Sequence, residues 1–257
     1  MRVDLYLFKS GHVKSRSAAK ALIESGAVML DGEMISKPSL EIDENAEHSV
    51  VITQKERFVG RGGLKLEAAL EQFNIDVTGL DAIDVGASTG GFTDCLLQRG
   101  AKSVIAVDSG EGQLDARLAN DERVTNIEKY NARQLSRELV TNGVDIAVMD
   151  VSFISQTLIL PNFADLIRSG GLAVTLIKPQ FEAGRAAIGK GGIVKNKKDR
   201  FMSILRVRDS AAASGLYMTD ITVSPITGGD GNVEYLAKFQ REAVSLSDNE
   251  IKKKTGL

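Results

Sequence analysis

The chain has 257 residues, of which 43% are hydrophobic and 26% are charged, and its formal net charge is -2. This composition excludes a collagen-like or intrinsically disordered chain, and the length is sufficient for one large domain and a smaller one. A net charge this close to zero excludes the binding of a long polyanion through overall charge alone.

The first 52 residues predict a small unit of two helices and a short sheet. Apolar stretches over residues 2–10 and 15–26 predict the helices, the second with a serine N-cap and a glycine terminator. Asp31-Gly32 lies between two apolar stretches and is a strong signal for a β-hairpin. Residues 49–52 predict a further strand.

This N-terminal stretch resembles the S4 RNA-binding domain. The segment SRSAAKALIESGAVMLDG matches the family's "SR..A...I..G.V.(D/N)G" core, and a Lys-Pro pair follows it, so that the resemblance covers residues 1–55. Residues 43–47 stand where the family usually has Gly-Asp, which is a departure from its pattern. S4 domains present basic side chains of the second helix and of the hairpin to structured RNA. The resemblance therefore implies contacts to phosphates by Lys14, Arg16 and Lys20.

Basic residues are concentrated in two separate stretches of the chain. Residues 1–20 carry five basic side chains and one acid, and residues 185–208 carry eight basic side chains and one acid. Either stretch alone is also explained by a solvated helix face or a flexible loop. Together with the S4 resemblance they favour RNA as the partner. Outside the S4 segment, the predicted RNA contacts are Arg61, Arg185, Lys190, Lys195, Lys197 and Lys198.

From about residue 80 onward, short apolar runs alternate with helical stretches. The runs lie at 82–85, 103–107, 144–149 and 172–177, and such continuous apolar strands predict a parallel sheet covered on both faces. Two further strands near the C-terminus are joined by a glycine-rich turn, which makes them antiparallel. Ligands of parallel sheets bind at the carboxyl ends of the strands.

A glycine loop, DVGASTGGFT, follows the first of these strands. Its G-x-x-x-G-G spacing meets neither the dinucleotide nor the P-loop pattern. Asp108 ends the next strand, where a carboxylate can bind both hydroxyls of a ribose. The combination predicts S-adenosylmethionine, which has a ribose and no phosphate; an ordinary glycine-rich turn with a surface aspartate is the alternative. The predicted cofactor-binding residues are Asp84, Gly86, Ala87, Ser88, Thr89, Gly90, Gly91, Phe92, Asp108, Asn131 and Asp150.

Two of these assignments have an equally simple structural explanation. Phe92, at the start of a helix, is also typical of core packing. Asn131 is also typical of an Asx turn.

Three charged residues are expected at the same edge of the predicted sheet, and a fourth lies in the helix that leads into the sheet. Asp150 and Lys178 each end a strand, Glu234 begins the last one, and Lys65 lies in the helix that precedes the sheet. They resemble the Lys-Asp-Lys-Glu set of the FtsJ-like ribose 2'-O-methyltransferases. With the S4 segment, the resemblance narrows to the TlyA family, whose members methylate cytidine ribose in ribosomal RNA. The supporting segments are RGGLKL, DVGASTGGFTD, MDVSF, IKPQFE and GGDGNVEYL.

The resemblance implies an α/β fold, with a Rossmann-like, seven-stranded sheet of S-adenosylmethionine-dependent methyltransferases and a small N-terminal α+β S4 domain. The expected boundaries are residues 1–55 for the S4 domain, 56–63 for a linker and 64–257 for the methyltransferase domain.

The chemistry of such a site requires a base, because a ribose hydroxyl is a poor acid. A free lysine has a reference pKa of about 10.4 and serves as a base only where burial or a second ammonium favours its neutral form. We expect Lys178 to be this base and Asp150 to lie near the transferred methyl group. Glu234 and Lys65 are expected to orient the base and the ribose.

Three other functions remain open at this stage. Methylation of an exocyclic base amine normally uses an Asp/Asn-Pro-Pro-aromatic loop, and residues 150–153 lack both prolines. The older name of the family suggests a haemolysin, and RNA binding without catalysis is the third alternative. The atom that gains the methyl group distinguishes the two enzymes.

The remaining composition bears on metals and compartments. The single cysteine, Cys95, excludes an intrachain disulfide, and we expect no metal site and no acid partner for His12 or His48. The N-terminal apolar stretch is interrupted by charges, and no stretch reaches about 18 apolar residues. We therefore expect a cytoplasmic protein without a membrane partner that acts on ribosomal RNA or ribosomal subunits. No prediction of its oligomeric state follows.

Overall fold

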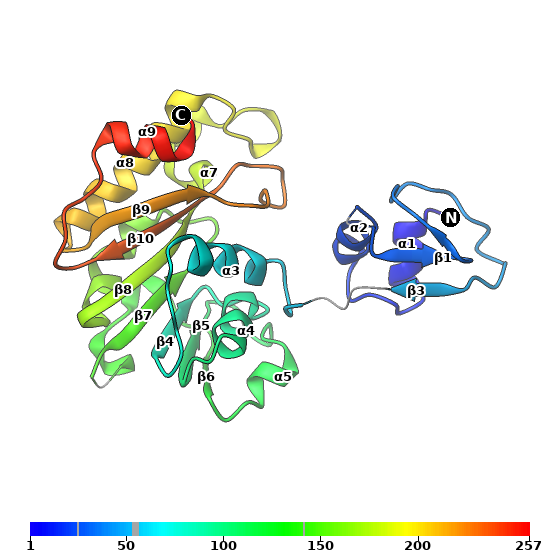
Figure 1. Cartoon of the computed structure of the whole chain (residues 1–257), viewed down its shortest axis with the longest axis horizontal. Helices are drawn as coiled ribbons and strands as arrows, with labels where there is room; N and C mark the ends of the chain where they lie inside the picture. The colour runs from blue at the N-terminus through cyan, green and yellow to red at the C-terminus, as the bar shows by residue number, and fades with distance from the viewer. Residues whose placement is uncertain (25, 53–56, 141) are drawn as a thin grey trace. The chain divides into compact units, whose positions relative to one another are not determined.

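The computed structural model describes residues 1–24, 26–52, 57–140 and 142–257. The chain divides into two compact units, Met1–Arg57 and Phe58–Leu257 (Figure 1). The expected end of the S4 domain, at 53–55, and the first residue of the expected linker lie outside the described residues.

A seven-stranded sheet forms the centre of the larger unit, in the order β6-β5-β4-β7-β8-β10-β9. All neighbours pair in parallel except β10, which is antiparallel to both β8 and β9. The predicted parallel sheet with an antiparallel final pair is thus confirmed. The strands are β4 (Asp81–Val85), β5 (Ser103–Val107), β6 (Val124–Ile127), β7 (Val144–Met149), β8 (Ile167–Ile177), β9 (Tyr217–Val223) and β10 (Tyr235–Gln240).

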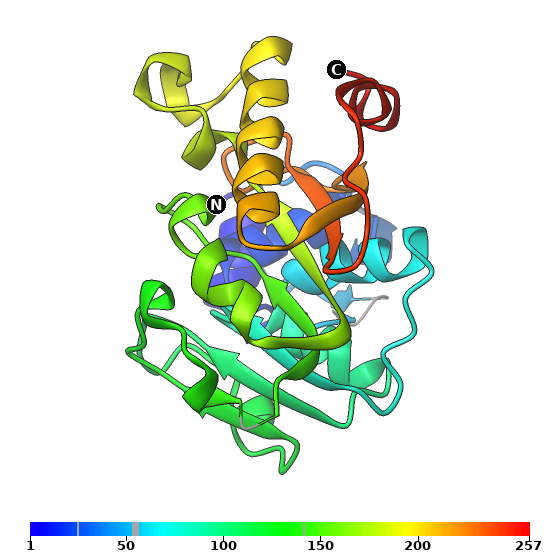
Figure 2. The ribbon, with the colours of Figure 1, turned by 90° about the vertical axis from the view of Figure 1, so that its left-hand side faces the viewer.

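Helices cover both faces of this sheet, with α6 and α8 in front of it in Figure 2. The helices are α3 (Gly62–Gln72), α4 (Gly91–Gln98), α5 (Ala116–Ala119), α6 (Leu160–Asp165), α7 (Pro179–Glu182), α8 (Lys197–Ala213) and α9 (Asp248–Thr255). Short 3-10 turns at 132–134, 137–139, 156–158, 185–187 and 190–192 complete the connections.

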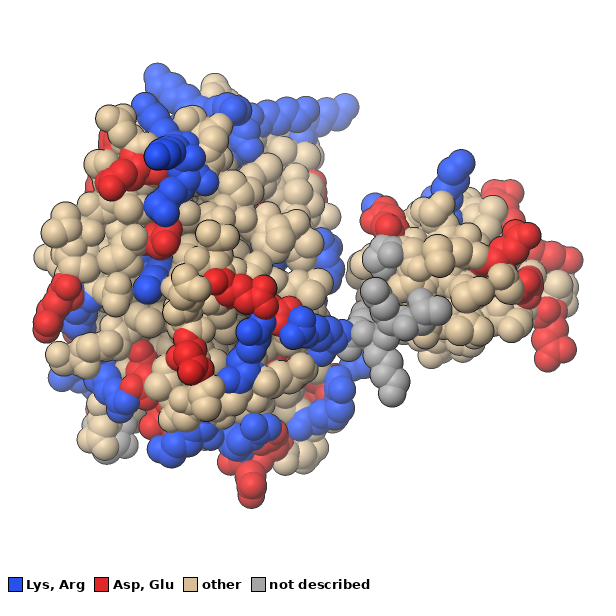
Figure 3. Space-filling model, in the orientation of Figure 1, with Lys and Arg blue, Asp and Glu red and all other residues tan. Residues whose placement is uncertain are grey.

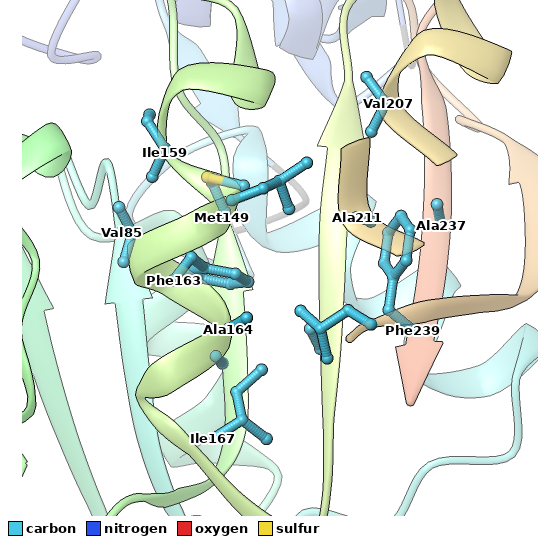
Figure 4. Packing of buried hydrophobic residues seen from close by; sticks show 14 of the residues in the cluster. Val85, Met149, Ile159, Phe163, Ala164, Ile167, Val207, Ala211, Ala237 and Phe239 are labelled. Carbon is cyan, nitrogen blue, oxygen red and sulfur yellow. The ribbon is translucent and has the colours of Figure 1, made fainter. Parts of the chain in front are cut away.

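Alternate residues of one strand belong to two different cores. In β7, Ile146 and Val148 pack in the cluster with α3 and α4, whereas Ala147 and Met149 pack in the cluster with α6 and α8. Figure 4 shows the second cluster, in which Phe163 of α6 faces the sheet. Burial on both faces explains why the strands are continuously apolar rather than alternating.

The entry into α3 differs from the expected linker at 56–63. Phe58 is buried in the core of the larger unit, and Gly62 begins α3. A Cβ on Gly63 would lie 2.3 Å from the Phe58 ring, so the packing requires glycine at this position. Residues 58–63 therefore belong to the larger unit.

The smaller unit has the two predicted helices and the predicted hairpin. It contains α1 (Val3–Lys9), α2 (Arg16–Glu24), β1 (Val28–Leu30), β2 (Glu33–Met34) and β3 (Val50–Ile52), with β1 between the other two strands. The Ser15 hydroxyl accepts the N–H of Ala18 at 3.1 Å, as expected of an N-cap. Asp31 and Gly32 have φ values of 51° and 83°, which suit the hairpin turn.

His48 has an acid partner, contrary to our expectation from the sequence. Its Nδ1 lies 2.7 Å from Asp31 Oδ2, and its Nε2 lies 2.8 Å from the Asp43 carbonyl oxygen. The hydrogen bond to Asp31 raises the pKa of His48, and the same bond lowers the pKa of Asp31. The partner is 17 residues away, so local sequence did not reveal it.

We predict that Asp31→Asn lowers the pKa of His48, since it removes the charge that favours the imidazolium. Asparagine tolerates the positive φ at this position, so the turn should persist. The pair stabilises the unit while His48 is protonated and Asp31 ionised. Its contribution to stability is therefore fully present between about pH 4 and pH 6.5. It is lost as the pH rises through the raised pKa of His48, and it is also lost as the pH falls through the lowered pKa of Asp31.

NMR titration of the two histidine rings measures this effect, with His12 as the internal reference. A midpoint for His48 that is the same in Asp31→Asn and in the parent protein would contradict the pairing.

Candidate active site

Two adjoining cavities open at the carboxyl ends of the parallel strands. The larger has a volume of about 470 Å³ and the smaller about 190 Å³. Both are lined by Gly86, Ser88, Asp150 and Ser152, so they form one continuous site. Val107, Asp108, Ser109, Gln113, Tyr130, Asn131, Ala132, Val151, Phe153 and Ile154 complete the larger cavity, and Gly62, Ala87, Thr89, Gly91, Phe92 and Lys178 complete the smaller one.

The glycine loop is held by the aspartate of the next strand. Asp108 Oδ2 accepts the N–H of Ser88 at 2.8 Å, and its Oδ1 accepts the N–H of Gly110 at 2.7 Å. Each carboxylate oxygen can accept a further hydrogen bond, and Asp108 lines the larger cavity. Asp108 can therefore fix the loop and accept hydrogen bonds from a ligand's hydroxyl groups at the same time.

Nine of the eleven predicted cofactor residues line these cavities; Asp84 and Gly90 do not. Gly90 has a φ of 94°, and a Cβ there would lie 2.3 Å from Leu118, so this glycine serves packing. Phe92 lines the smaller cavity and is also buried in the core, and Asn131 lines the larger one while its side chain caps the turn at 132–134. Both residues therefore have the structural role expected as the alternative, and both also line a cavity.

Asp84 lies beneath the loop and is fully buried. Its Oδ2 accepts the Thr93 hydroxyl at 2.7 Å, whereas its Oδ1 has no hydrogen-bond partner. Burial raises the pKa of Asp84 to about 7, and the negative charges of Asp150 and Asp108 act in the same direction. This carboxyl thus bonds to the first turn of α4 and lines neither cavity.

The four predicted catalytic residues form two ion pairs. Lys178 Nζ lies 2.6 Å from Asp150 Oδ1 and donates to the Ser152 hydroxyl at 2.8 Å. Lys65 Nζ lies 2.6 Å from Glu234 Oε2, and the Glu234 side chain is 2% exposed. Gln180, two residues after Lys178, donates to Glu234 Oε1 at 3.5 Å. Of the four, Asp150 and Lys178 line the cavities, whereas Lys65 and Glu234 line neither of them.

Ser152 and Phe153 also line the cavities, and the sequence pattern predicts a role for neither. Phe153 is 92% exposed at the mouth of the larger cavity, with a positive φ of 63°. Its ring centroid lies 5.2 Å from that of Phe181. An exposed phenylalanine in this strained backbone conformation is uncommon, and neither property can be derived from the residue's place in the MDVSF segment.

The loop that carries Phe153 is held by hydrogen bonds to the buried side chain of Glu182. The buried carboxylate of Glu182 accepts the Ser155 hydroxyl at 2.5 Å and the N–H of Gln156 at 2.8 Å. Burial raises the pKa of Glu182. Gln156 in turn donates to the Leu176 carbonyl of β8 at 2.7 Å. The chain between Asp150 and α6 is therefore tied to the strand that ends at Lys178.

The predicted RNA contacts differ in how they are held. Arg16 Nε lies 3.0 Å from Asp4 Oδ2, and Lys20 forms a 3.7 Å pair with Glu24. Arg61 donates to the Thr227 carbonyl at 3.0 Å, in the loop before Glu234. All of the predicted basic contacts, Lys14, Arg16, Lys20, Arg61, Arg185, Lys190, Lys195, Lys197 and Lys198, are exposed.

The basic segment of the larger unit is ordered rather than an open loop. It forms two 3-10 turns and then enters α8, and Lys197 donates to the Gly256 carbonyl at 2.8 Å. In the space-filling view, Lys and Arg side chains gather at the end of the larger unit where this segment and the start of α8 lie (Figure 3).

The sequence of the chain matches known families and relatives along most of its length. Residues 58–241 match the FtsJ-like methyltransferase family, and residues 1–48 match the S4 domain. The chain is 42% identical over 234 residues to the 16S/23S rRNA (cytidine-2'-O)-methyltransferase TlyA of Mycobacterium tuberculosis, covering 91% of this chain and 87% of that protein. It is 40% identical to hemolysin A of Brachyspira hyodysenteriae, covering 93% of this chain and 99% of the relative.

Solved structures agree with these matches. A structure described as a hemolysin, from Streptococcus thermophilus, is 42% identical, with a TM-score of 0.76 over 99% of this chain and 93% of that one. An S-adenosylmethionine-dependent methyltransferase from Mesorhizobium loti is 17% identical, with a TM-score of 0.53 over 71% of this chain and all of that one, which shows the fold alone. The predicted fold is confirmed.

No helix among the described residues is both long and apolar enough to cross a membrane. The chain belongs to the TlyA family, in which an S4 domain precedes an FtsJ-like methyltransferase domain.

Proposed function

We propose that this protein transfers the methyl group of S-adenosylmethionine to a ribose 2'-hydroxyl of ribosomal RNA, with cytidine as the modified nucleoside. The observation that carries the proposal is the Lys178–Asp150 pair, 2.6 Å apart, in the wall of the smaller cavity beside the glycine loop. The name of the TlyA relative supports the same reaction and the same substrate.

The larger cavity fits the cofactor in size and in chemistry. Asp108 offers a carboxylate for the ribose hydroxyls, and Gly86 lets the backbone approach a ligand closely. Asn131 and Tyr130 are available for the adenine end. When bound there, S-adenosylmethionine supplies an electrophilic methyl group on a sulfonium.

Lys178 is the proposed base for the 2'-hydroxyl. Neutral Lys178 Nζ accepts the hydroxyl proton, and the Asp150 carboxylate stabilises the ammonium that results. The Ser152 hydroxyl, 2.8 Å from Nζ, restricts the direction in which the amine points. Lys65, held by Glu234, adds a fixed positive charge that stabilises the developing alkoxide.

The same geometry speaks against methylation of a base amine. A ribose hydroxyl is a poor acid and needs a base for its attack, which Lys178 in the cavity wall supplies, whereas a neutral amine nucleophile needs no base to begin its attack. Residues 150–153 also lack the two prolines of amine methyltransferases. The exposed ring of Phe153 fits RNA as the substrate, because aromatic faces stack on unpaired bases.

Mapping of the methylated position tests the proposal directly. Isolated ribosomal subunits are incubated with the protein and labelled S-adenosylmethionine, and the modified nucleotides are then analysed. Label on a ribose 2'-oxygen is the expected result. Label on a base atom would instead establish the amine reaction.

We predict that Asp108→Ala weakens S-adenosylmethionine binding by about 1.5 to 3 kcal/mol, through loss of charge-assisted hydrogen bonds. Calorimetric titration measures the affinity of each protein for S-adenosylmethionine. Asp76→Ala is the matched control, because Asp76 also accepts a backbone N–H but lies outside both cavities. Equal affinity in Asp108→Ala and the parent protein would remove Asp108 from the cofactor site.

Lys178→Ala should reduce single-turnover methyl transfer by at least about 100-fold while cofactor affinity stays nearly unchanged. Lys178→Arg should be almost as inactive, because arginine keeps the ion pair but does not release its proton at neutral pH. Lys102→Ala, which removes a surface lysine paired with Asp81 at 3.2 Å, serves as the control. Substantial activity in Lys178→Arg would disprove the role as base.

RNA affinity should fall steeply with salt, because the contacts are to phosphates. The paired substitution Lys190→Ala/Lys195→Ala should reduce the slope of log K against log salt by roughly one unit per lost contact.

Removal of residues 1–57 should abolish methylation of ribosomal RNA while cofactor affinity is preserved, since the larger unit has its own core. Normal methylation by the truncated protein would show that the larger unit recognises RNA unaided.

A further inference from the structure

The loop between β9 and β10 contains a buried asparagine that bonds to a distant segment. Asn232 is 1% exposed. Its Oδ1 accepts the N–H of Val194 at 3.1 Å, and its Nδ2 donates to the Gly192 carbonyl at 3.0 Å. The two ends of one amide thus bind the backbone on both sides of residue 193, about 40 positions earlier in the chain. Nothing in the mechanism above uses this side chain.

The same loop determines where Glu234 lies. The Asn232 carbonyl accepts the N–H of Gly228 at 2.9 Å, and Ser224 donates its N–H to the Glu234 carbonyl at 2.9 Å. A Cβ on Gly228 would lie 2.5 Å from Glu234 Oε1. Because the loop backbone packs directly against the carboxylate, a change in its path would displace Glu234 and, with it, Lys65.

The segment that Asn232 binds is the basic one. Arg185, Lys190 and Lys195 are exposed on it, whereas Val194 is buried with 2% exposure. A hydrogen bond of 3.0 Å from the Gly189 N–H to the Ile193 carbonyl closes the turn. One face of this segment therefore presents cations to the solvent, and its backbone is attached to the loop that carries Glu234.

We propose that Asn232 is a positioning residue that couples the docking of RNA phosphates on segment 185–198 to the placement of Glu234 and Lys65. This inference rests on the proposed function and names a route by which the substrate influences the site. RNA bound to the cations restrains the segment. The Asn232 amide transmits that restraint to the loop, and the Lys65–Glu234 pair is held in its catalytic position.

The first experiment compares Asn232→Ala and Asn232→Asp in the full-length protein. Alanine removes both hydrogen bonds of the Asn232 amide. Aspartate keeps the acceptor for the Val194 N–H but places a second oxygen beside the Gly192 carbonyl, where two acceptors repel each other. Asn120→Ala is the matched control, since Asn120 is exposed and its Nδ2 donates to a backbone carbonyl of α5 at 2.7 Å. Single-turnover methylation of isolated ribosomal subunits, their binding affinity and the affinity for S-adenosylmethionine are measured for each protein.

The single-turnover rate should fall about tenfold or more in both Asn232 variants, while both affinities change by less than about threefold. Asn120→Ala should match the parent protein. A purely structural role would instead reduce cofactor affinity and thermal stability together with the rate. That result, or a normal rate in both Asn232 variants, would overturn the proposal.

A double-mutant cycle tests the coupling itself. In the parent background, Lys190→Ala/Lys195→Ala should lower both RNA affinity and the single-turnover rate at saturating RNA. In the Asn232→Ala background the same change should lower affinity alone, because the route to Glu234 is already broken. Additive losses of rate would contradict the coupling. If the alanine variant does not fold, Asn232→Asp takes its place in the cycle.

Hydrogen exchange of the unmodified protein supplies a readout that depends on no variant. Binding of ribosomal subunits should slow exchange at the amides of Val194 and Gly228 in parallel, since both bond to Asn232. Protection of Val194 alone would overturn the proposal. Absence of ribosomal RNA methylation by the parent protein would overturn the proposed function and the coupling with it, whereas a normal rate in the Asn232 variants overturns only the coupling.

Discussion

The close approach of two backbone segments at Gly86 is the contact on which the site depends. Gly86 has a φ of 87°, and a Cβ there would lie 2.4 Å from the Asp150 carbonyl oxygen. The Asp150 N–H also donates to the Val85 carbonyl at 3.0 Å. Because β4 and β7 are neighbours, this contact joins the glycine loop to the residue that pairs with Lys178. The glycine loop and the Asp150–Lys178 pair are thus held together by backbone packing, which side-chain motion does not disturb.

The charges at this rim are balanced in two different ways. Asp150 and Glu234 each have a lysine at 2.6 Å, which offsets the cost of removing a carboxylate from water. Asp84 has no such cation, and burial raises its pKa to about 7. Protonated Asp84 therefore stabilises the folded state relative to ionised Asp84. This contribution to the free energy of unfolding is fully present below pH 3.8 and is lost as the pH rises through about 7. Asp84 is therefore accommodated through its raised pKa rather than through an ion pair.

The sequence predicted the strand-end residues well, and the reason is geometric. Asp150 and Lys178 follow apolar runs that pair in parallel, and parallel pairing brings the ends of the runs to one edge of the sheet. The sequence pattern alone was therefore sufficient to predict that these two residues lie close together. The sequence could not distinguish Asp84 and Gly90 from the neighbouring residues that line the cavities. The Asp84 side chain bonds to Thr93, and a Cβ on Gly90 would clash with Leu118; neither contact can be read from the local sequence. The His48–Asp31 pair and the exposure of Phe153 likewise depend on tertiary contacts that have no local signature in the sequence.

A chain with a net charge of -2 must position its cations if it is to hold RNA. The structure does this with buried polar groups that lie behind the exposed charges. The buried carboxylate of Asp4 lies 3.0 Å from the guanidinium of Arg16, and the buried amide of Asn232 holds the backbone of the segment that carries Lys190 and Lys195. In both places the restraint leaves the exposed cationic atoms accessible, because it acts on one side of a guanidinium or on the main chain. A phosphate contact made by a restrained cation loses less conformational entropy than one made by a free side chain. Placement, rather than total charge, is therefore what allows this acidic protein to act on RNA.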